Sequence, residues 1–325
     1  MTVRLGPLAA RVLRNPLTAV GFLACFPFLV PYKALATQVL IYGLFALGFN
    51  LIYGYTGLLS FGHAAFFGLG AYGTGIALAR LHMGSILAAL LVGLVAAALG
   101  GALIGFLCLR RRGIYFAMLT LAFAQLLYFV AFHLSWVTGG DDGLRGIPVL
   151  PLGLPGWAIS IDSPAAYYYF VLALAGLALL LLQRILESPF GAVLQAIREN
   201  PDRATACGYN IDRIKLLSFV FSAGFAGLAG GLNALYLRIV PIDTLYWTTS
   251  GQVVMMTLLG GAGTFIGPFV GAGVFLVLED VLSVWTESWQ LVVGAIFMIF
   301  VLFLPRGIWG TLLDRLPVAG RPSGQ

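Results

Sequence analysis

The sequence predicts an all-α polytopic membrane protein with about ten transmembrane helices. Its composition points to the bilayer, because 60% of the 325 residues are hydrophobic and only 9% are charged, against roughly 25% charged in a soluble domain. The charged residues are also clustered, which leaves long stretches without Asp, Glu, Lys or Arg. No soluble core of this size could bury so much apolar surface. The whole chain, residues 1–325, is therefore expected to form a single transmembrane domain.

A helical span needs roughly 20 apolar residues, and each uncharged stretch holds one or two spans. Ala34–Ala79 is long enough for two crossings that meet near Tyr53–Gly57. Thr244–Leu278 holds either one long span or two short ones that meet near Gly260–Gly267. The remaining stretches hold one span each, and they are Asn15–Tyr32, Gly84–Leu109, Gly113–Gly140, Ser163–Gln183, Leu216–Leu237 and Ser288–Pro305.

Basic residues set the orientation, because short cytoplasmic loops are enriched in Arg and Lys. With ten spans and both termini in the cytoplasm, four of the 18 basic residues lie outside, namely Lys33, Arg80, Arg145 and Arg238. A nine-span arrangement would place seven outside, so ten spans in a bacterial inner membrane is the prediction. The first stretch also resembles a signal peptide, with Ala34-Leu35-Ala36 as a cleavage-like site. That alternative leaves the remaining topology unchanged.

The spans divide into two four-helix blocks, the second to fifth and the seventh to tenth, which enter the membrane from opposite sides. The third span, Gly57–Tyr72, and the eighth, Gly251–Gly263, occupy matching places, and both are short or rich in glycine. Broken helices at matching places of inverted halves are typical of a transport path, because non-helical backbone survives in a bilayer only where it is shielded from lipid. The alternative is that small residues simply let helices approach closely.

Uncharged polar residues in the middle of spans are the candidates for lining a transport path. Ser60 and His63 are three residues apart on one helical face, and a polar pair at membrane depth must find partners. Hydrogen bonding between helices is the alternative role. The full set of candidates is Asn50, Ser60, His63, Thr120, Gln125, Asn233 and Thr257.

The large cytoplasmic loop, residues 184–215, predicts two short capped helices. Ser188-Pro189 is typical of an N-cap followed by a first-turn proline, Asn200-Pro201 ends that helix and begins another, and Gly208 ends the second. One apolar stripe on the first helix consists of Phe190, Val193, Leu194 and Ile197. Such an element suits insertion into a groove of a partner protein. A helix that rests on lipid headgroups is the alternative.

Several function classes are disfavoured by what the sequence lacks. A P-loop needs a Gly-Lys pair, but the two lysines, Lys33 and Lys215, follow Tyr32 and Ile214. Proton-coupled carriers usually place acidic or paired charges inside their spans, and no Asp, Glu, Lys or Arg lies clearly in the middle of a predicted span here. An intramembrane hydrolase needs an activated nucleophile with a base and further catalytic groups, and the sequence shows no third group beside Ser60 and His63. The three cysteines show no metal-ligand spacing. We therefore expect a permease powered by separate ATPase subunits, not an enzyme, with no metal or cofactor of its own and no nucleic-acid partner.

Four stretches resemble the branched-chain amino-acid ABC-transporter permease family, in particular its M-type subunit. They are Gly54–Phe66, Thr138–Pro148, Ser188–Asn200 and Leu258–Pro268. The resemblance implies half of a translocation path for branched-chain or related amino acids. It also implies four partners besides membrane lipid: a homologous H-type permease, two cytoplasmic ATPases that use the ATP, and a periplasmic solute-binding protein. Alternatives are a urea or amide permease of the same family, or a self-contained channel or secondary carrier.

By the same resemblance, the cytoplasmic loop would be the coupling element that contacts an ATPase. Its expected contact residues are Phe190, Val193, Leu194, Ile197, Arg198, Glu199 and Gly208. One departure is that the Glu-Ala-Ala signature of many importer permeases is degraded to Asp202–Gly208 here. That departure puts the individual contact residues in doubt.

The longest outer loop, residues 134–164, is the expected docking side of a binding protein. Its segment Gly139–Gly143 has the composition of a turn. Because the lobes of binding proteins commonly present acidic side chains, the outer arginines Arg80, Arg145 and Arg238 are the docking candidates. The alternative for Arg145 is a local ion pair with Asp141 or Asp142.

Overall fold

The computed structural model describes residues 21, 23–24, 32–148, 150–154, 157–159 and 162–315. Nearly all of the first predicted span, with its signal-peptide alternative, therefore lies outside the described residues, as do both termini. The described part is helical, as predicted. Its one sheet is a short hairpin of β1 (Leu152–Leu154) and β2 (Trp157–Ile159) in the outer loop.

The helices follow one another in the order that the uncharged stretches predict. The long ones are α3 (Lys33–Asn50), α4 (His63–Ala79), α5 (Ile86–Cys108), α6 (Ile114–His133), α8 (Pro164–Glu187), α11 (Ile211–Leu237), α12 (Trp247–Gly260), α13 (Gly267–Trp285) and α14 (Trp289–Phe303). The short ones are the π-helical turn η2 (Leu51–Tyr55), α7 (Ser135–Thr138), η3 (Gly140–Asp142), α9 (Pro189–Glu199), α10 (Pro201–Ala206), η4 (Ile242–Leu245) and α15 (Gly307–Arg315).

Seven helical stretches in the described residues are long and apolar enough to cross a bilayer. They are Lys33–Tyr55, Ile86–Cys108, Ile114–His133, Pro164–Glu187, Ile211–Leu237, Gly267–Trp285 and Trp289–Leu312. The chain is therefore a multi-pass helical membrane protein. Helices α4 and α12 have 17 and 14 residues, fewer than the roughly 20 of a full span, and they correspond to the predicted third and eighth spans.

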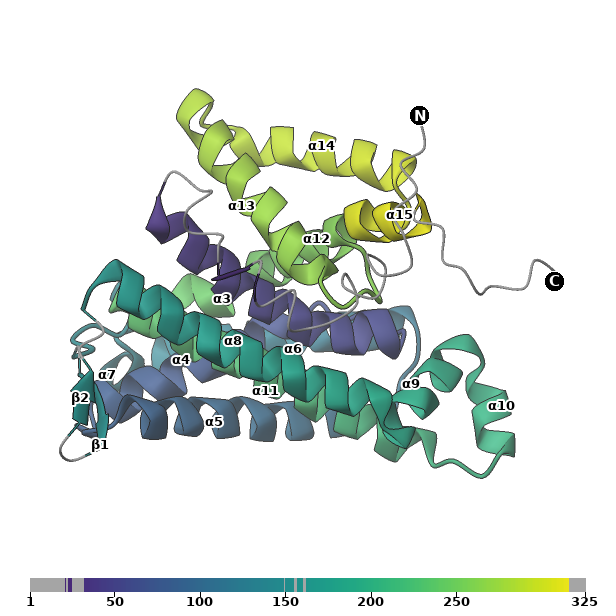
Figure 1. The fold of residues 1–325 in the computed structure, drawn as a ribbon. Coiled ribbons are helices and arrows are strands. Elements are labelled where there is room, and N and C mark those ends of the chain that lie inside the picture. Colours follow the sequence, from purple (N-terminus) through teal and green to yellow (C-terminus); the bar gives the residue numbers. More distant parts are fainter. Residues whose placement is uncertain are drawn as a thin grey trace.

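Helix α3 lies at the centre of the molecule, with nearly all of its residues buried. It packs on α11, α13, α8 and α12, and α11 in turn packs on α4 and α5 (Figure 1). Glycines allow these close approaches: Gly70 lies against the backbone of Gly227, and Gly271 against the backbone of Met256. Since lipid tails are as apolar as the helices, such close packing is a main source of helix association in a membrane.

The molecule has two chemically different ends. Figure 1 shows α9 and α10 at one end, and α7 with the β1–β2 hairpin at the opposite end. At the hairpin end, the Tyr236 hydroxyl reaches the Ala34 carbonyl, 3.4 Å away, so the start of α3 meets the end of α11 and the two helices are antiparallel. Arg80, Arg145 and Arg238 also lie at this end. These three arginines are thus at the opposite end of the bundle from α9 and α10, which carry Arg198 and Arg203.

Candidate functional site

The central helix α3 ends in a break that a single amide group stabilises. After Asn50 the chain makes one π-helical turn and then a non-helical segment before α4 begins. The Asn50 Nδ2 donates to the Thr264 carbonyl at 2.8 Å, and its Oδ1 accepts from the Gly263 amide at 2.8 Å. Asn50 therefore clamps the loop between α12 and α13 to the end of α3. Both of its polar groups thus bond this loop, which gives Asn50 a structural role at the break.

Arg198 of α9 reaches the same break. Its guanidinium donates from Nη1 to the Gly54 carbonyl, which lies near the C-terminal end of the α3–η2 helix. A positive charge is favourable at a helix C-terminus, where carbonyls lack helical partners. Its stem covers Gly57, where a Cβ would lie 3.1 Å from the Arg198 Cγ. Gly57 has a φ of +79°, which only glycine adopts readily.

Three hydroxyl groups accept hydrogen bonds from backbone amides at, or just before, the start of α4. The Phe61 amide donates to Thr120 Oγ1 at 3.2 Å, and the Gly62 amide donates to Ser60 Oγ at 3.3 Å. The Ala64 amide donates to Oγ of Ser250, on α12, at 2.8 Å. The first amides of a helix have no helical partner, and an unsatisfied amide is costly in an apolar medium. Ser60 and Thr120 thus have a structural task at the break between η2 and α4.

His63 is fully buried and makes a hydrogen bond to α11. Its Nε2 lies 2.7 Å from Ser222 Oγ, and that hydroxyl lies 2.6 Å from the Gly48 carbonyl. Because the serine hydrogen is used on the carbonyl, we assign the imidazole hydrogen to Nε2, which then donates to Ser222. Nδ1 has no hydrogen-bond partner among the described residues. The ring is surrounded by Phe45, Phe49, Phe66 and Phe219.

Three path candidates remain. Thr257 is fully buried, and its hydroxyl lies 2.8 Å from the Val253 carbonyl of its own helix and 3.4 Å from the Ala46 carbonyl of α3. Asn233, on α11, is 3% exposed and Gln125, on α6, is half-buried. Neither side chain has a hydrogen-bond partner within the described ranges. Their place in a transport path stays a prediction.

The two helices predicted in the loop of residues 184–215 are confirmed as α9 and α10. Asn200 caps α10 by accepting from the Arg203 amide at 3.0 Å, and Gly208 has a φ of +86°. The free loop is shorter than predicted, because α8 continues to Glu187 and α11 begins at Ile211.

The apolar stripe of α9 is already covered by this chain. Leu194 is fully buried in the main core, and Phe190 meets Phe221 of α11 edge to face. Val193 and Ile197 form a small cluster with Ala204, packed against Ile211 and Ile214 of α11. Contact with a partner would therefore have to be made by the opposite, exposed face, which includes Gln195, Glu199, Asp202 and Arg203.

The outer loop places two of the docking candidates together. Arg145 Nη2 lies 3.5 Å from Asp142 Oδ1, and both side chains are largely exposed. The predicted local ion pair of Arg145 is therefore present. Such a surface pair is worth about 0–1 kcal/mol, so Arg145 is not locked in place by it. Arg80 lines the same surface hollow, of about 330 Å³.

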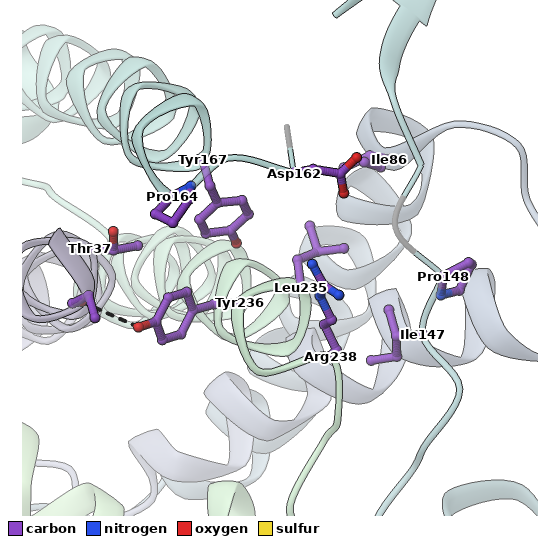
Figure 2. Close-up of a pocket in the computed structure, with 11 residues that line it drawn as sticks. Thr37, Ile86, Ile147, Pro148, Asp162, Pro164, Tyr167, Leu235, Tyr236 and Arg238 are labelled. Atoms are coloured by element: carbon purple, nitrogen blue, oxygen red, sulfur yellow. Dashed lines mark hydrogen bonds between the residues drawn. The ribbon is translucent and has the colours of Figure 1, made fainter. Parts of the chain in front are cut away.

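Arg238 lines a separate cavity of about 210 Å³ at the same end, where α3, α5, α8 and α11 meet. Figure 2 shows Arg238 and Asp162 on this cavity, together with Tyr167 and Tyr236. The Tyr167 hydroxyl already donates to the Leu232 carbonyl at 2.6 Å. Of these groups, the two charged side chains are exposed, which suits contact with a solute or protein on this side.

Several residues of the junction are not among the candidates that the sequence indicates. Ser222 and Ser250 are fully buried hydroxyls in apolar helices, so the rule that singled out Ser60 and Thr120 could have found them. Gly263 and Thr264 contribute backbone groups, which no side-chain pattern reveals.

Comparison with known proteins settles the family. A family model described as the permease component of the branched-chain amino acid transport system matches residues 32–302. The chain belongs to this family. Two relatives carry the name high-affinity branched-chain amino acid transport system permease protein LivM. That of Salmonella typhimurium is 30% identical over 322 residues, 92% of this chain and 76% of the relative. That of Escherichia coli K12 is 30% identical over 304 residues, which cover 87% of this chain and 71% of the relative.

The LivH permease of Salmonella typhimurium is also similar, at 27% identity over 286 residues, which cover 83% of this chain and 91% of LivH. The branched-chain amino acid permease family thus contains two homologous kinds of chain, and this chain is LivM-like. The expectation of a membrane transport subunit rather than an enzyme is confirmed.

Proposed function

We propose that the chain is one half of the translocation unit of an ABC importer that takes branched-chain or related amino acids into a bacterial cell. In this proposal it pairs with an H-type permease, two cytoplasmic ATPases supply the energy by using ATP, and a periplasmic binding protein delivers the solute. The chain itself binds no cofactor. The names of its LivM and LivH relatives support the choice of solute.

The observation that carries the proposal is a matching set of helix contacts in two halves of the chain. Helix α3 packs on α13 as α11 packs on α5, α3 packs on α12 as α11 packs on α4, and α4 packs on α5 as α12 packs on α13. Because α3 and α11 are antiparallel, the matching halves have opposite directions. This pattern supports two inverted four-helix blocks with α4 and α12 as the short, broken members. Inverted repeats with discontinuous helices are typical of membrane transporters.

We place α9 and α10 in the cytoplasm and the hairpin end outside, in the inner membrane, with both termini cytoplasmic and ten spans in all. The distribution of Arg and Lys supports this orientation. The exposed face of α9 and α10 is then available to an ATPase. The outer arginines Arg80, Arg145 and Arg238 are available to the binding protein.

Reconstitution of the chain with its four partners in proteoliposomes tests the proposal. We expect uptake of L-leucine that requires ATP, the binding protein and ATPases with an intact P-loop lysine. Uptake of urea but not of leucine would favour the urea or amide permease. Leucine uptake by the permease chains alone, without ATPases, would establish a self-contained channel or carrier instead.

A further inference from the structure

Arg198 joins three segments that are far apart in the sequence. It belongs to α9, its guanidinium donates to the carbonyl of Gly54 in η2, and its stem lies over Gly57 in the turn that follows. The third segment is the loop between α12 and α13, since a Cβ on Gly263 would lie 3.0 Å from Arg198 Nη1. One side chain of the cytoplasmic loop therefore sits where the two broken regions of the membrane domain meet.

The two broken regions also touch each other directly. A Cβ on Gly54 would overlap Asn50 Oδ1 and the Gly263 amide nitrogen, and Asn50 bonds both Gly263 and Thr264. Gly263, with a φ of +79°, has a conformation that glycine adopts readily. Glycine at these positions lets the backbone groups approach one another and the guanidinium. A displacement of η2 would thus displace the loop between α12 and α13 as well.

Most of the packing of α9 and α10 is directed elsewhere. Their apolar residues pack on α8, α11 and one another, and α9 also packs on η2. Arg198 alone is described as donating a side-chain hydrogen bond from α9 or α10 to the breaks. A guanidinium suits this position because its several N–H groups are fixed in one plane, whereas an ammonium is a single point of contact.

We propose that Arg198 is the positioning residue that transmits movement of the ATPase-facing helices α9 and α10 to the two helix breaks, through Gly54 and the Asn50–Gly263 contact. This inference rests on the proposed function, because it presumes that ATPases act on α9 and α10. In it, Arg198 does not touch the solute or ATP. Loss of the Arg198 contact therefore lowers solute transport without lowering the rate of ATP hydrolysis or disrupting assembly of the subunits.

The first test uses the complete importer in proteoliposomes and measures leucine uptake and phosphate release in the same vesicles. We expect Arg198→Gln to lower uptake by about tenfold or more, the effect of losing one charge-assisted hydrogen bond, with hydrolysis within about twofold of wild type. Arg198→Lys should restore part of the uptake, since an ammonium still donates to Gly54. Arg213→Gln is the control, because Arg213, like Arg198, is an exposed arginine at the same end, but its side chain has no hydrogen-bond partner among the described residues. Unchanged uptake, or a parallel loss of hydrolysis in an assembled complex, would overturn the proposal.

The second test concerns the link itself and needs no ATPase. In the purified full-length chain, we expect Arg198→Gln to speed amide hydrogen exchange by about tenfold in peptides covering both 54–59 and 261–265. Arg213→Gln should leave both unchanged. Exchange that rises in neither peptide, or only in 54–59, would show that Arg198 does not hold the two breaks together. A wild-type importer without ATP-driven uptake would instead defeat the proposed function while this link still stood.

Discussion

Replacing Asn50 by alanine removes two hydrogen bonds that join helices more than 200 residues apart in sequence. The Gly263 amide and the Thr264 carbonyl, each 2.8 Å from the Asn50 amide, would both lose their partner. An unsatisfied polar group costs roughly 1–3 kcal/mol. We expect a total of about 2–4 kcal/mol, because both bonds are only partly buried.

The measurement is thermal unfolding of the purified chain in detergent, with Asn233→Ala as the matched control. Asn233 is also a buried asparagine in a central helix, but its side chain has no hydrogen-bond partner among the described residues. At roughly 2–4 °C per kcal/mol, Asn50→Ala should lower the Tm by about 5 °C or more, and Asn233→Ala by less. Equal Tm values for the two variants would refute the clamp. Reduced transport by an Asn50→Ala variant with unchanged Tm would return Asn50 to the transport path.

Three further predictions follow from burial and contacts. Leu194→Asp should lower the yield of folded protein, because Leu194 is fully buried. Gln195→Asp, on the exposed face, should leave the yield unchanged, and size-exclusion chromatography of the two variants measures the difference. Gly54→Ala should lower the Tm because its Cβ overlaps neighbouring atoms, whereas Gly251→Ala, with nothing within 4 Å, should be tolerated; equal Tm values would contradict the close approach. Arg145→Glu should change the free energy of unfolding by under about 0.5 kcal/mol. If Arg145 contacts the binding protein, the variant should slow association of that protein and flatten the salt dependence of its rate. Unchanged association kinetics would leave Arg145 as a local ion-pair partner.

Features that depend on nearby residues were predictable from the sequence. Helices α9 and α10 begin at Pro189 and Pro201, as the pairs Ser188-Pro189 and Asn200-Pro201 predict. Asn200 caps α10 with its side chain, whereas the Ser188 hydroxyl donates to the Ile185 carbonyl and does not cap α9. The apolar stripe of α9 correctly indicates a buried face. It does not reveal what covers that face, since a partner groove and the chain's own α8 and α11 demand the same pattern.

Contacts across the bundle were not predictable in the same way. The sequence indicates that Asn50 and His63 need partners, because unpaired polar groups are costly in a membrane. Their partners, Thr264 and Ser222, are 214 and 159 residues away. Choosing among the many hydroxyls and carbonyls at that separation requires the packing of the helices. In the same way, a serine that bonds a nearby amide, as Ser60 bonds Gly62, and a serine that lines a transport path have the same sequence signature.

The hydrogen-bond partners of the two helix breaks explain why Arg198 can couple α9 to the membrane domain. A break leaves amides and carbonyls unpaired, and these must find partners where lipid supplies none. At the start of α4, hydroxyls from α6 and α12 serve this need. At the end of α3, Arg198 of α9 donates to the Gly54 carbonyl, and Asn50 accepts from the Gly263 amide of the loop between α12 and α13. Arg198 thus satisfies a carbonyl that the break exposes, and in doing so it makes the geometry of the break depend on the position of α9.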